Sequence, residues 1–290
     1  MKRELDHLVL PVESLEQARR RLSALGFTVA ANASHPFGTR NACVFLEDGH
    51  YLEPLAIGDT HVYAAQSKTG NTFVYRDDLF RKRRGQEGFS GIIAKAFDAE
   101  ADHRSFVETN ISGGAPLSFS RPVTLPDGQI SEASFRLAFA GGDEASDVFF
   151  ATCQRLSELS VARSDLTRHG NGVIGIREVV LSAERPLDFA PVVERVFGIS
   201  GKVGGAGDVS FKTGAVVLRI VAPSLAQQMF GSAQQKNTTR LCGEAIILSV
   251  SDLAVTEALL AANGVAHMRN GARLLVQRAP GQGAILAFEE

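Results

Sequence analysis

The segment that decides the fold is Leu5-Asp6-His7-Leu8-Val9-Leu10-Pro11-Val12, which lies close to the start of the chain. Its apolar run predicts a buried strand. Ser14-Leu15-Glu16-Gln17 comes next and has the capping pattern that satisfies free amide groups at a helix start. The helix that follows has one apolar face, made of Leu15, Ala18, Leu22 and Leu25. Gly26 predicts its end, because glycine readily adopts the left-handed conformation found at helix C-termini.

Strand-like runs follow this helix and complete a short unit. They cover residues 27–31, 41–45 and 50–57. The order of elements up to residue 57 is therefore strand, helix, strand, strand, strand (βαβββ). One such unit leaves the inner face of its small sheet exposed, so we expect it to pair with a second unit.

The same order of elements recurs along the chain, and this repetition is the most informative feature of the sequence. In three copies the end of the first strand precedes the terminating glycine by 16, 17 and 16 residues: Leu10 to Gly26, Leu181 to Gly198, and Leu248 to Gly264. A less regular copy lies between the first and the third. The predicted elements of the further copies are strands 91–97, 117–121, 133–140 and 148–154 with helix 99–110, strands 176–181, 209–212 and 215–221 with helix 187–197, and strands 246–250, 273–277 and 284–289 with helix 253–263.

The repeats predict an α+β protein in which four βαβββ units pair into two half-barrel domains, residues 1–160 and 161–290. A half-barrel surrounds a cleft between its two units. We expect the main cleft in residues 1–160, because the polar candidates for inward-facing positions all lie there. The C-terminal domain is expected to be supporting, since its counterpart positions are mostly apolar: Val179, Val217, Ile247 and Leu286.

The connections between the units are polar or rich in turn residues. They cover residues 58–87, 155–172 and 223–243. The basic run 81–84 in the first of them is interpreted as part of a solvated linker. The glycine-rich stretch 201–207 lacks the lysine and hydroxyl positions of a phosphate-binding loop, so it is interpreted as a hairpin connection.

The composition is that of a globular protein without a strong charge. The 290 residues are 44% hydrophobic and 21% charged, with a formal net charge of −2. No apolar run approaches the ~20 residues of a membrane-spanning helix, and no overall field attracts nucleic acid or anionic lipid. The charged start lacks the apolar region of a signal peptide, so we expect a cytoplasmic protein. Three isolated cysteines, Cys43, Cys153 and Cys242, predict neither a disulfide framework nor a zinc knuckle, and each is expected to be buried.

Within this repeat frame the chain resembles the vicinal oxygen chelate superfamily, and more closely its glyoxalase-like members. The resemblance is strongest over residues 5–57. It rests there on Asp6-His7-Leu8-Val9-Leu10, Leu25-Gly26-Phe27, His35-Pro36-Phe37-Gly38-Thr39-Arg40-Asn41-Ala42 and Tyr51-Leu52-Glu53-Pro54-Leu55. Further support comes from Leu125-Pro126-Asp127-Gly128 with Arg136, and from Phe149-Phe150-Ala151-Thr152-Cys153-Gln154.

The resemblance implies a site with one divalent ion. In that superfamily the first and last strands of a unit line the cleft and supply ligands to an ion that chelates two neighbouring substrate oxygens. The ion stabilises the negative charge of an enolate or oxyanion, which allows lyase, isomerase, dioxygenase or ring-opening chemistry. His7 and Glu53 match the ligand positions of the first unit, so they are expected to be metal ligands and catalytic residues. Imidazole and carboxylate suit Fe, Mn, Ni or Zn.

The other units depart from this pattern. In the second unit the position of His7 falls near Ile92, and only Gln154 could serve as a ligand on its last strand. The third unit has Glu178 near the position of His7 but Leu218 or Arg219 at the other position. A catalytic metal site usually has three protein ligands, so Gln154 or His35 would have to complete the shell.

Further residues are expected to contact a substrate. His35, Thr39 and Asn41 could donate hydrogen bonds at the cleft mouth, although an ordinary turn explains this segment equally well. Arg136 could clamp a substrate carboxylate, or it could lie on a solvated strand face. Without a metal, Glu53 would need another partner, such as His7 or Arg136, because an unpaired buried carboxylate is costly.

Two functions remain open from the sequence. The first is an enzyme that acts on a small oxygen-rich molecule with a divalent ion at His7 and Glu53. The second is a metal-free protein of the same fold that binds or sequesters a small molecule. The expected partner in both is a small molecule, with no nucleic acid and no membrane, and the chain is expected to be a monomer or a homodimer.

Overall fold

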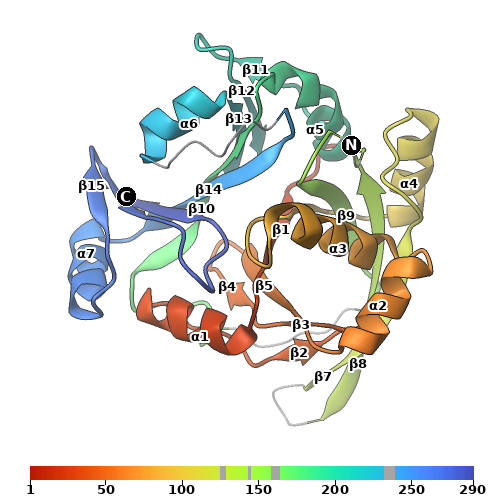
Figure 1. Ribbon diagram of the computed structural model, residues 1–290, viewed down its shortest axis with the longest axis horizontal. Helices are drawn as coiled ribbons and strands as arrows, with labels where there is room; N and C mark the ends of the chain where they lie inside the picture. Colours follow the sequence, from red (N-terminus) through yellow and green to blue (C-terminus); the bar gives the residue numbers. More distant parts are fainter. Residues whose placement is uncertain (125–128, 143–144, 158–163, 232–238) are drawn as a thin grey trace.

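We describe a computed structural model of the chain that covers residues 1–124, 129–142, 145–157, 164–231 and 239–290. The described residues form two curved sheets, and each sheet contains two βαβββ units (Figure 1). The predicted fold class is confirmed: the protein is α+β, with four units paired into two half-barrels. The regular spacing of apolar strands, capped helices and glycine stops therefore specifies the architecture.

The first sheet is built from the first two units. Its strand order is β2-β3-β5-β1-β6-β9-β8-β7, and the short strand β4 also pairs with β5. The units meet where β1 and β6 run antiparallel at the middle of the sheet. The strands are β1 (Leu5–Pro11), β2 (Ala33–Ser34), β3 (Thr39–Asn41), β4 (Val44–Phe45), β5 (Tyr51–Ile57), β6 (Gly91–Lys95), β7 (Leu117–Thr124), β8 (Ile130–Ala140) and β9 (Phe149–Arg155).

The second sheet repeats this topology with the last two units. Its strand order is β11-β12-β13-β10-β14-β17-β16-β15, and β10 and β14 are the central antiparallel pair. The strands are β10 (Val173–Ser182), β11 (Lys202–Val203), β12 (Val209–Thr213), β13 (Val216–Val221), β14 (Cys242–Val250), β15 (Met268–Asn270), β16 (Arg273–Val276) and β17 (Ile285–Glu289). The stretch 201–207 joins β11 to β12 through a turn, which confirms the predicted hairpin.

Helices of the repeating units pack where the two halves meet. They are α1 (Leu15–Ala24), α4 (Ala99–Glu108), α5 (Ala190–Phe197), which follows the short 3-10 helix η1 (Pro186–Phe189), and α7 (Leu253–Ala262). The largest hydrophobic cluster joins both sheets, because it combines Leu8 of β1 and Leu22 of α1 with Val179 of β10 and Leu260 of α7. Burial of this shared cluster stabilises each sheet against the other.

The end of α1 shows how closely the halves approach. Gly26 has a φ of +89°, and a Cβ there would lie 2.8 Å from side-chain atoms of Asn171 and Leu259. The Asn171 side chain donates to the carbonyl of Leu25 over 2.8 Å. Both the left-handed conformation and the close contact therefore require glycine at this predicted helix end.

The connection 58–87 is more ordered than the sequence suggested. It forms α2 (Thr60–Lys68) and α3 (Thr72–Arg84), and Asp59 and Asn71 cap their first turns. The interpretation of the basic run 81–84 as a solvated linker is wrong, because Arg81 is buried and bonded to Asp77 and to backbone carbonyls. The third connection likewise contains α6 (Pro223–Phe230).

The predicted strand at 27–31 is absent from the described secondary structure. The physical reason is that Arg19 of α1 donates to the carbonyls of Val29 and Ala30, which a strand partner would otherwise satisfy. All three cysteines are buried, as predicted. Among the described residues, no helix has the length and apolar character needed to cross a membrane.

Candidate functional site

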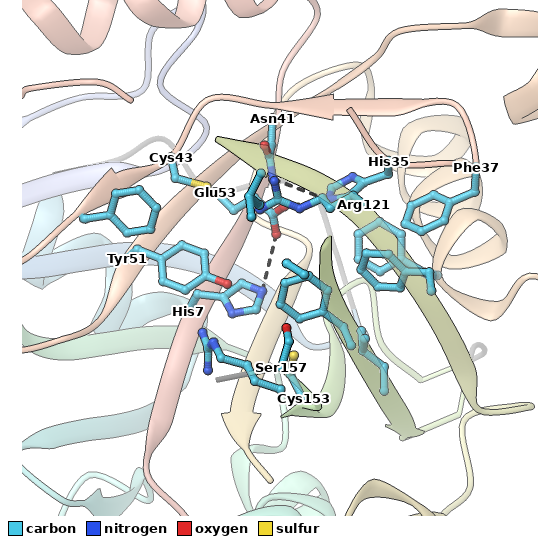
Figure 2. Close-up of a pocket in the computed structure, with 18 residues that line it drawn as sticks. His7, His35, Phe37, Asn41, Cys43, Tyr51, Glu53, Arg121, Cys153 and Ser157 are labelled. Carbon is cyan, nitrogen blue, oxygen red and sulfur yellow. Dashed lines mark hydrogen bonds and ion pairs between the residues drawn. The ribbon is translucent and has the colours of Figure 1, made fainter. Parts of the chain in front are cut away.

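A cavity of about 110 Å³ lies on one face of the first sheet. Its walls come from β1, β3, β4, β5, β7, β8, β9 and helix α3, so both N-terminal units contribute (Figure 2). Aromatic rings and two arginines line it together with a few polar side chains. The mixture of an apolar wall with convergent polar groups is typical of small-molecule sites.

A continuous chain of polar contacts crosses the cavity floor. His7 Nε2 lies 3.3 Å from Glu53 Oε2, and His7 Nδ1 lies 2.7 Å from Asp6 Oδ2. Arg155 donates to both Asp6 oxygens over 2.8 and 3.0 Å, and Asn41 donates to Glu53 Oε1 over 2.6 Å. Figure 2 shows His7 and Asn41 on opposite sides of the Glu53 carboxylate. The histidine is therefore held between two carboxylates that are themselves fixed.

The strands explain why these groups converge. The pairing of β1 with β6 shifts register between Leu5 and His7, so Asp6 is the extra residue of a bulge. A bulge redirects a side chain, and here it lets the Asp6 carboxylate reach the neighbouring imidazole. On the other side, β5 runs parallel to β1 with Tyr51 opposite His7, and the two rings stack 4.3 Å apart. Tyr51 and Glu53 share a face of β5 because side chains alternate along a strand.

The charged forms of His7 and Glu53 stabilise each other. Burial alone would raise the pKa of Glu53, but the hydrogen bond and the charge of His7 outweigh it and hold that pKa at about 2. Burial alone would lower the pKa of His7, but Asp6 and Glu53 raise it above the ordinary value of 6.5. The protonated form of His7 is therefore favoured relative to a free imidazole, and it faces a carboxylate that is ionised at neutral pH.

His35 provides the contrast within the same cavity. Its Nδ1 lies 2.8 Å from Thr39 Oγ1, and its Nε2 lies 3.8 Å from Glu53 Oε1. Burial lowers the pKa of His35 to about 4, and Glu53 opposes this only in part. The two histidines of the cavity therefore have pKa values shifted in opposite directions, and His35 is neutral at neutral pH.

This difference predicts two separate histidine titrations. The midpoint of the His7 titration should lie above pH 6.5, whereas that of His35 should lie near pH 4. Because the folded pKa of His7 is raised, its contribution to stability is complete below pH 6.5 and is lost as pH rises through the folded value. Histidine NMR titration, assigned with His7→Gln and His35→Gln, measures both. A single shared titration near 6.5 would contradict the assignment.

The structure brings together most of the residues expected at the site. His7, Glu53, His35 and Asn41 all line the cavity. Thr39 lies behind His35 as its hydrogen-bond partner and is only 1% exposed, so it orients the ring instead of facing a substrate.

Two expected residues are not brought to the cavity. Gln154 accepts a hydrogen bond from the amide of Ala99 at the start of α4, and Arg136 pairs with Glu100 of the same helix over 2.6 Å. Both side chains lie on the outer face of their strands because strand neighbours alternate. This placement corrects the expectation that Gln154 binds a metal and that Arg136 clamps a substrate.

Other residues line the cavity instead of Gln154 and Arg136, and the sequence did not predict them. Cys153 and Arg155 flank Gln154 on β9 and face inward, and Arg121 reaches the cavity from β7. Phenylalanine side chains build much of the wall: Phe37, Phe45, Phe73, Phe119 and Phe135. The alternation on β9 could have indicated Arg155, but the aromatic wall comes from distant elements and has no local signal.

A divalent ion, which the resemblance implies, needs several donor side chains that converge in the cavity. His7, Glu53 and His35 are the donors that line the cavity, but Glu53 is already bonded to His7 and Asn41, and His35 lies 3.8 Å from Glu53. Among the described residues, no group of three or more His, Cys, Asp or Glu side chains could hold a metal ion. Arg121 and Arg155 add positive charge to the same cavity, which opposes a cation. The donor set does not fit a resident divalent ion.

The second sheet carries different chemistry at the matching place. Val9 lies opposite Glu53 between β1 and β5, and Val180 lies opposite Arg219 between β10 and β13. Arg219 therefore takes the position of Glu53, and by the same alignment Glu178 takes the position of His7.

These counterparts are engaged in ion pairs. Arg219 lies 2.7 Å from Asp208 and 3.8 Å from Glu178, and Arg273 pairs with Glu289 and lies 3.7 Å from Glu178. The charges at this place are therefore matched within the sheet by arginine–carboxylate pairs, whereas the first sheet has a histidine between two carboxylates.

Comparison with known protein families matches residues 5–197 to a family described as "Glyoxalase-like domain". The match covers the first sheet and continues into the third unit. Comparison with curated proteins gave no match.

Solved structures share the fold over nearly the whole chain. A hypothetical protein from Staphylococcus aureus has a TM-score of 0.69 at 12% identity, with 99% of each chain covered. A mutant of 4-hydroxymandelate synthase from Streptomyces coelicolor has a TM-score of 0.63 at 12% identity, with 99% of this chain and 92% of that chain covered. The Mn(II)-bound glyoxalase from Novosphingobium aromaticivorans has a TM-score of 0.52 at 10% identity, with coverage of 99% and 82%. At these identities the similarity shows the fold alone.

Proposed function

Because the chain belongs to the family of glyoxalase-like domains, we propose that it is an enzyme acting on a small oxygen-rich molecule in the N-terminal cavity. The observation that carries the proposal is the buried His7–Glu53 pair, which is 3.3 Å apart and open to that cavity. A buried ion pair is a weak source of stability, so its position in a cavity favours a chemical role. Residues 161–290 act in this proposal as a supporting domain.

The pair supplies a proton donor and a proton acceptor side by side. The His7 imidazolium donates to an oxygen on which negative charge develops, and the Glu53 carboxylate accepts a proton from a neighbouring atom. Asp6 fixes the ring orientation by accepting from Nδ1, as the carboxylate does in other histidine-dependent sites. This arrangement favours lyase or isomerase chemistry, in which a proton moves next to a carbonyl group.

The names of structural relatives support a small oxygenated substrate. One relative is a 4-hydroxymandelate synthase and another a Mn(II)-bound glyoxalase. Dioxygenase-type chemistry or a Fe, Mn, Ni or Zn ion would need a third ligand beside His7 and Glu53, and His35, the nearest candidate, does not form a metal-holding group with them in the described part of the chain.

The alternative function is a metal-free protein that binds or sequesters a small molecule. It is favoured by the closed contacts of the polar chain, since Asp6, His7 and Glu53 all have partners without a ligand. Binding without turnover would then be the whole activity.

Deuterium exchange separates the two functions. The protein is incubated in D2O with a panel of small 2-hydroxy ketones, 2-hydroxyaldehydes and 2-oxo acids, and proton NMR follows the signal next to the carbonyl. We expect catalysed loss of that signal for at least one compound, unchanged by EDTA or added Mn²⁺. Binding without exchange in the whole panel would favour the alternative. Activity that appears only with added metal, together with metal in protein purified without an affinity tag, would overturn the assessment of the donor set.

A further inference from the structure

Arg121 is a charged side chain of the N-terminal cavity that has no counter-ion among the described residues. Its side chain lines the cavity from β7, and its guanidinium lies 5.7 Å from the ring centroid of Phe135. Within the described residues it forms no ion pair. Figure 2 shows Arg121 beside His35 and Asn41, at the Glu53 end of the cavity.

The other charges of the cavity are already matched. Arg155 is bonded to both oxygens of Asp6, and His7 lies between Asp6 and Glu53. Arg121 therefore adds a positive charge for which the described residues offer no counter-ion. A half-buried guanidinium without a counter-ion favours an anionic ligand, because charge attraction is stronger away from bulk water.

The walls near Arg121 are aromatic. Phe119 stacks on Phe135 at 5.1 Å, and it meets Phe37 edge-to-face at the same separation. Phe73 closes the wall 5.5 Å from Phe37. The cavity of about 110 Å³ is of the same order as an apolar cavity of ~150 Å³ that accepts benzene. A single flat ring therefore matches both the size and the surface.

We propose that this cavity selects small aromatic carboxylates, with Arg121 binding the carboxylate and the phenylalanines holding the ring. The planar guanidinium fork matches a carboxylate with two parallel hydrogen bonds. The inference rests on the proposed function and deepens it, because it names the substrate class of the same site. It also makes Arg121 the residue that determines specificity for an anion.

Calorimetric titration with benzoate, benzamide and cyclohexanecarboxylate tests the proposal. Benzoate should bind the wild type, and benzamide, which has the same shape without the charge, should bind about 10- to 100-fold more weakly. Arg121→Gln should weaken benzoate binding by a similar factor and leave benzamide binding unchanged. Arg136→Gln is the matched control, since Arg136 lies on the outer face and pairs with Glu100. It should retain wild-type affinity for benzoate.

Equal affinity of the wild type for benzoate and benzamide would overturn the assignment of an anion site, even if Arg121→Gln failed to fold. Equal affinity for cyclohexanecarboxylate and benzoate would contradict the proposal that the phenylalanine wall selects an aromatic ring. The outcome of the deuterium-exchange assay is independent of the outcome of these titrations. If benzoate binds through Arg121 and no compound exchanges, the enzyme proposal fails and the ligand class stands. If neutral hydroxy ketones exchange and Arg121→Gln has no effect, the ligand class fails and the enzyme proposal stands.

Discussion

Replacing Glu53 by glutamine should lower the kcat/KM of any compound that the wild type turns over by about 10²- to 10⁴-fold. The glutamine keeps the size of the side chain and can still accept from Asn41, so the cavity keeps its shape. It cannot accept a proton, and it removes the negative charge that raises the pKa of His7. Both halves of the donor–acceptor pair are therefore weakened by one substitution.

Glu178→Gln is the matched control for this experiment. Glu178 takes the corresponding strand position in the second sheet, where it faces Arg219 and Arg273. Steady-state rates and circular dichroism of both variants give the answer, and Glu178→Gln should keep the wild-type kcat/KM. Full activity of Glu53→Gln would exclude Glu53 as the proton acceptor. A change in ligand affinity alone, with no turnover in either protein, would identify a binding protein.

The fold could be predicted because its signals are local. Each unit has an apolar strand, a capped helix and a glycine stop within a short window, and the spacing repeats along the chain. His7 and Glu53 could be placed together for the same reason: β1 and β5 are parallel neighbours, and period-two alternation puts both side chains on one face. Local rules thus located the centre of the site.

Which of the other side chains face into the cavity depends on the register of each strand, to within one residue. Gln154 was expected to face inward, but its neighbour Arg155 does so, and a shift of one position exchanges the two faces of a strand. The bulge at Asp6 is a second case, since only the pairing of β1 with β6 reveals the extra residue. Arg121 and the aromatic wall are brought in by pairing between β7 and β8, which the sequence does not show.

Helices α2 and α3 were missed for a different physical reason. Their caps are present in the sequence, as Asp59 before α2 and Asn71 before α3. However, α3 buries the charged residues Arg76, Asp77 and Arg81 beside apolar ones such as Phe73 and Phe80, so its inward face is mixed. Apolar periodicity identifies a helix only when its buried face is hydrophobic, and here an internal ion pair takes that place.

Breaking this ion pair should cause a large loss of stability. Arg81→Met should lower the free energy of unfolding by about 3–5 kcal/mol, because it leaves the Asp77 carboxylate buried and uncompensated. Asp77 is 1% exposed, and its Oδ2 accepts from Arg81 over 2.7 Å and from Tyr63 over 2.7 Å. Burial raises the pKa of Asp77, and the charge of Arg81 opposes that rise. Urea denaturation of the wild type and the variant measures the difference.

Arg81 also connects α3 to the strands of the site. Its guanidinium donates to the carbonyl of Val12, which follows β1, and to that of Leu55 on β5, and these strands carry His7 and Glu53. It also donates to the carbonyl of Gln86, just after α3. Lys82→Met is the control, since the neighbouring lysine is 70% exposed in its pair with Asp78 and should cost at most about 1 kcal/mol. Combining Asp77→Asn with Arg81→Met should restore part of the loss, because the buried charge is then removed. Equal stability of the Arg81→Met and Lys82→Met variants would show that the buried pair does not hold α3 against the sheet.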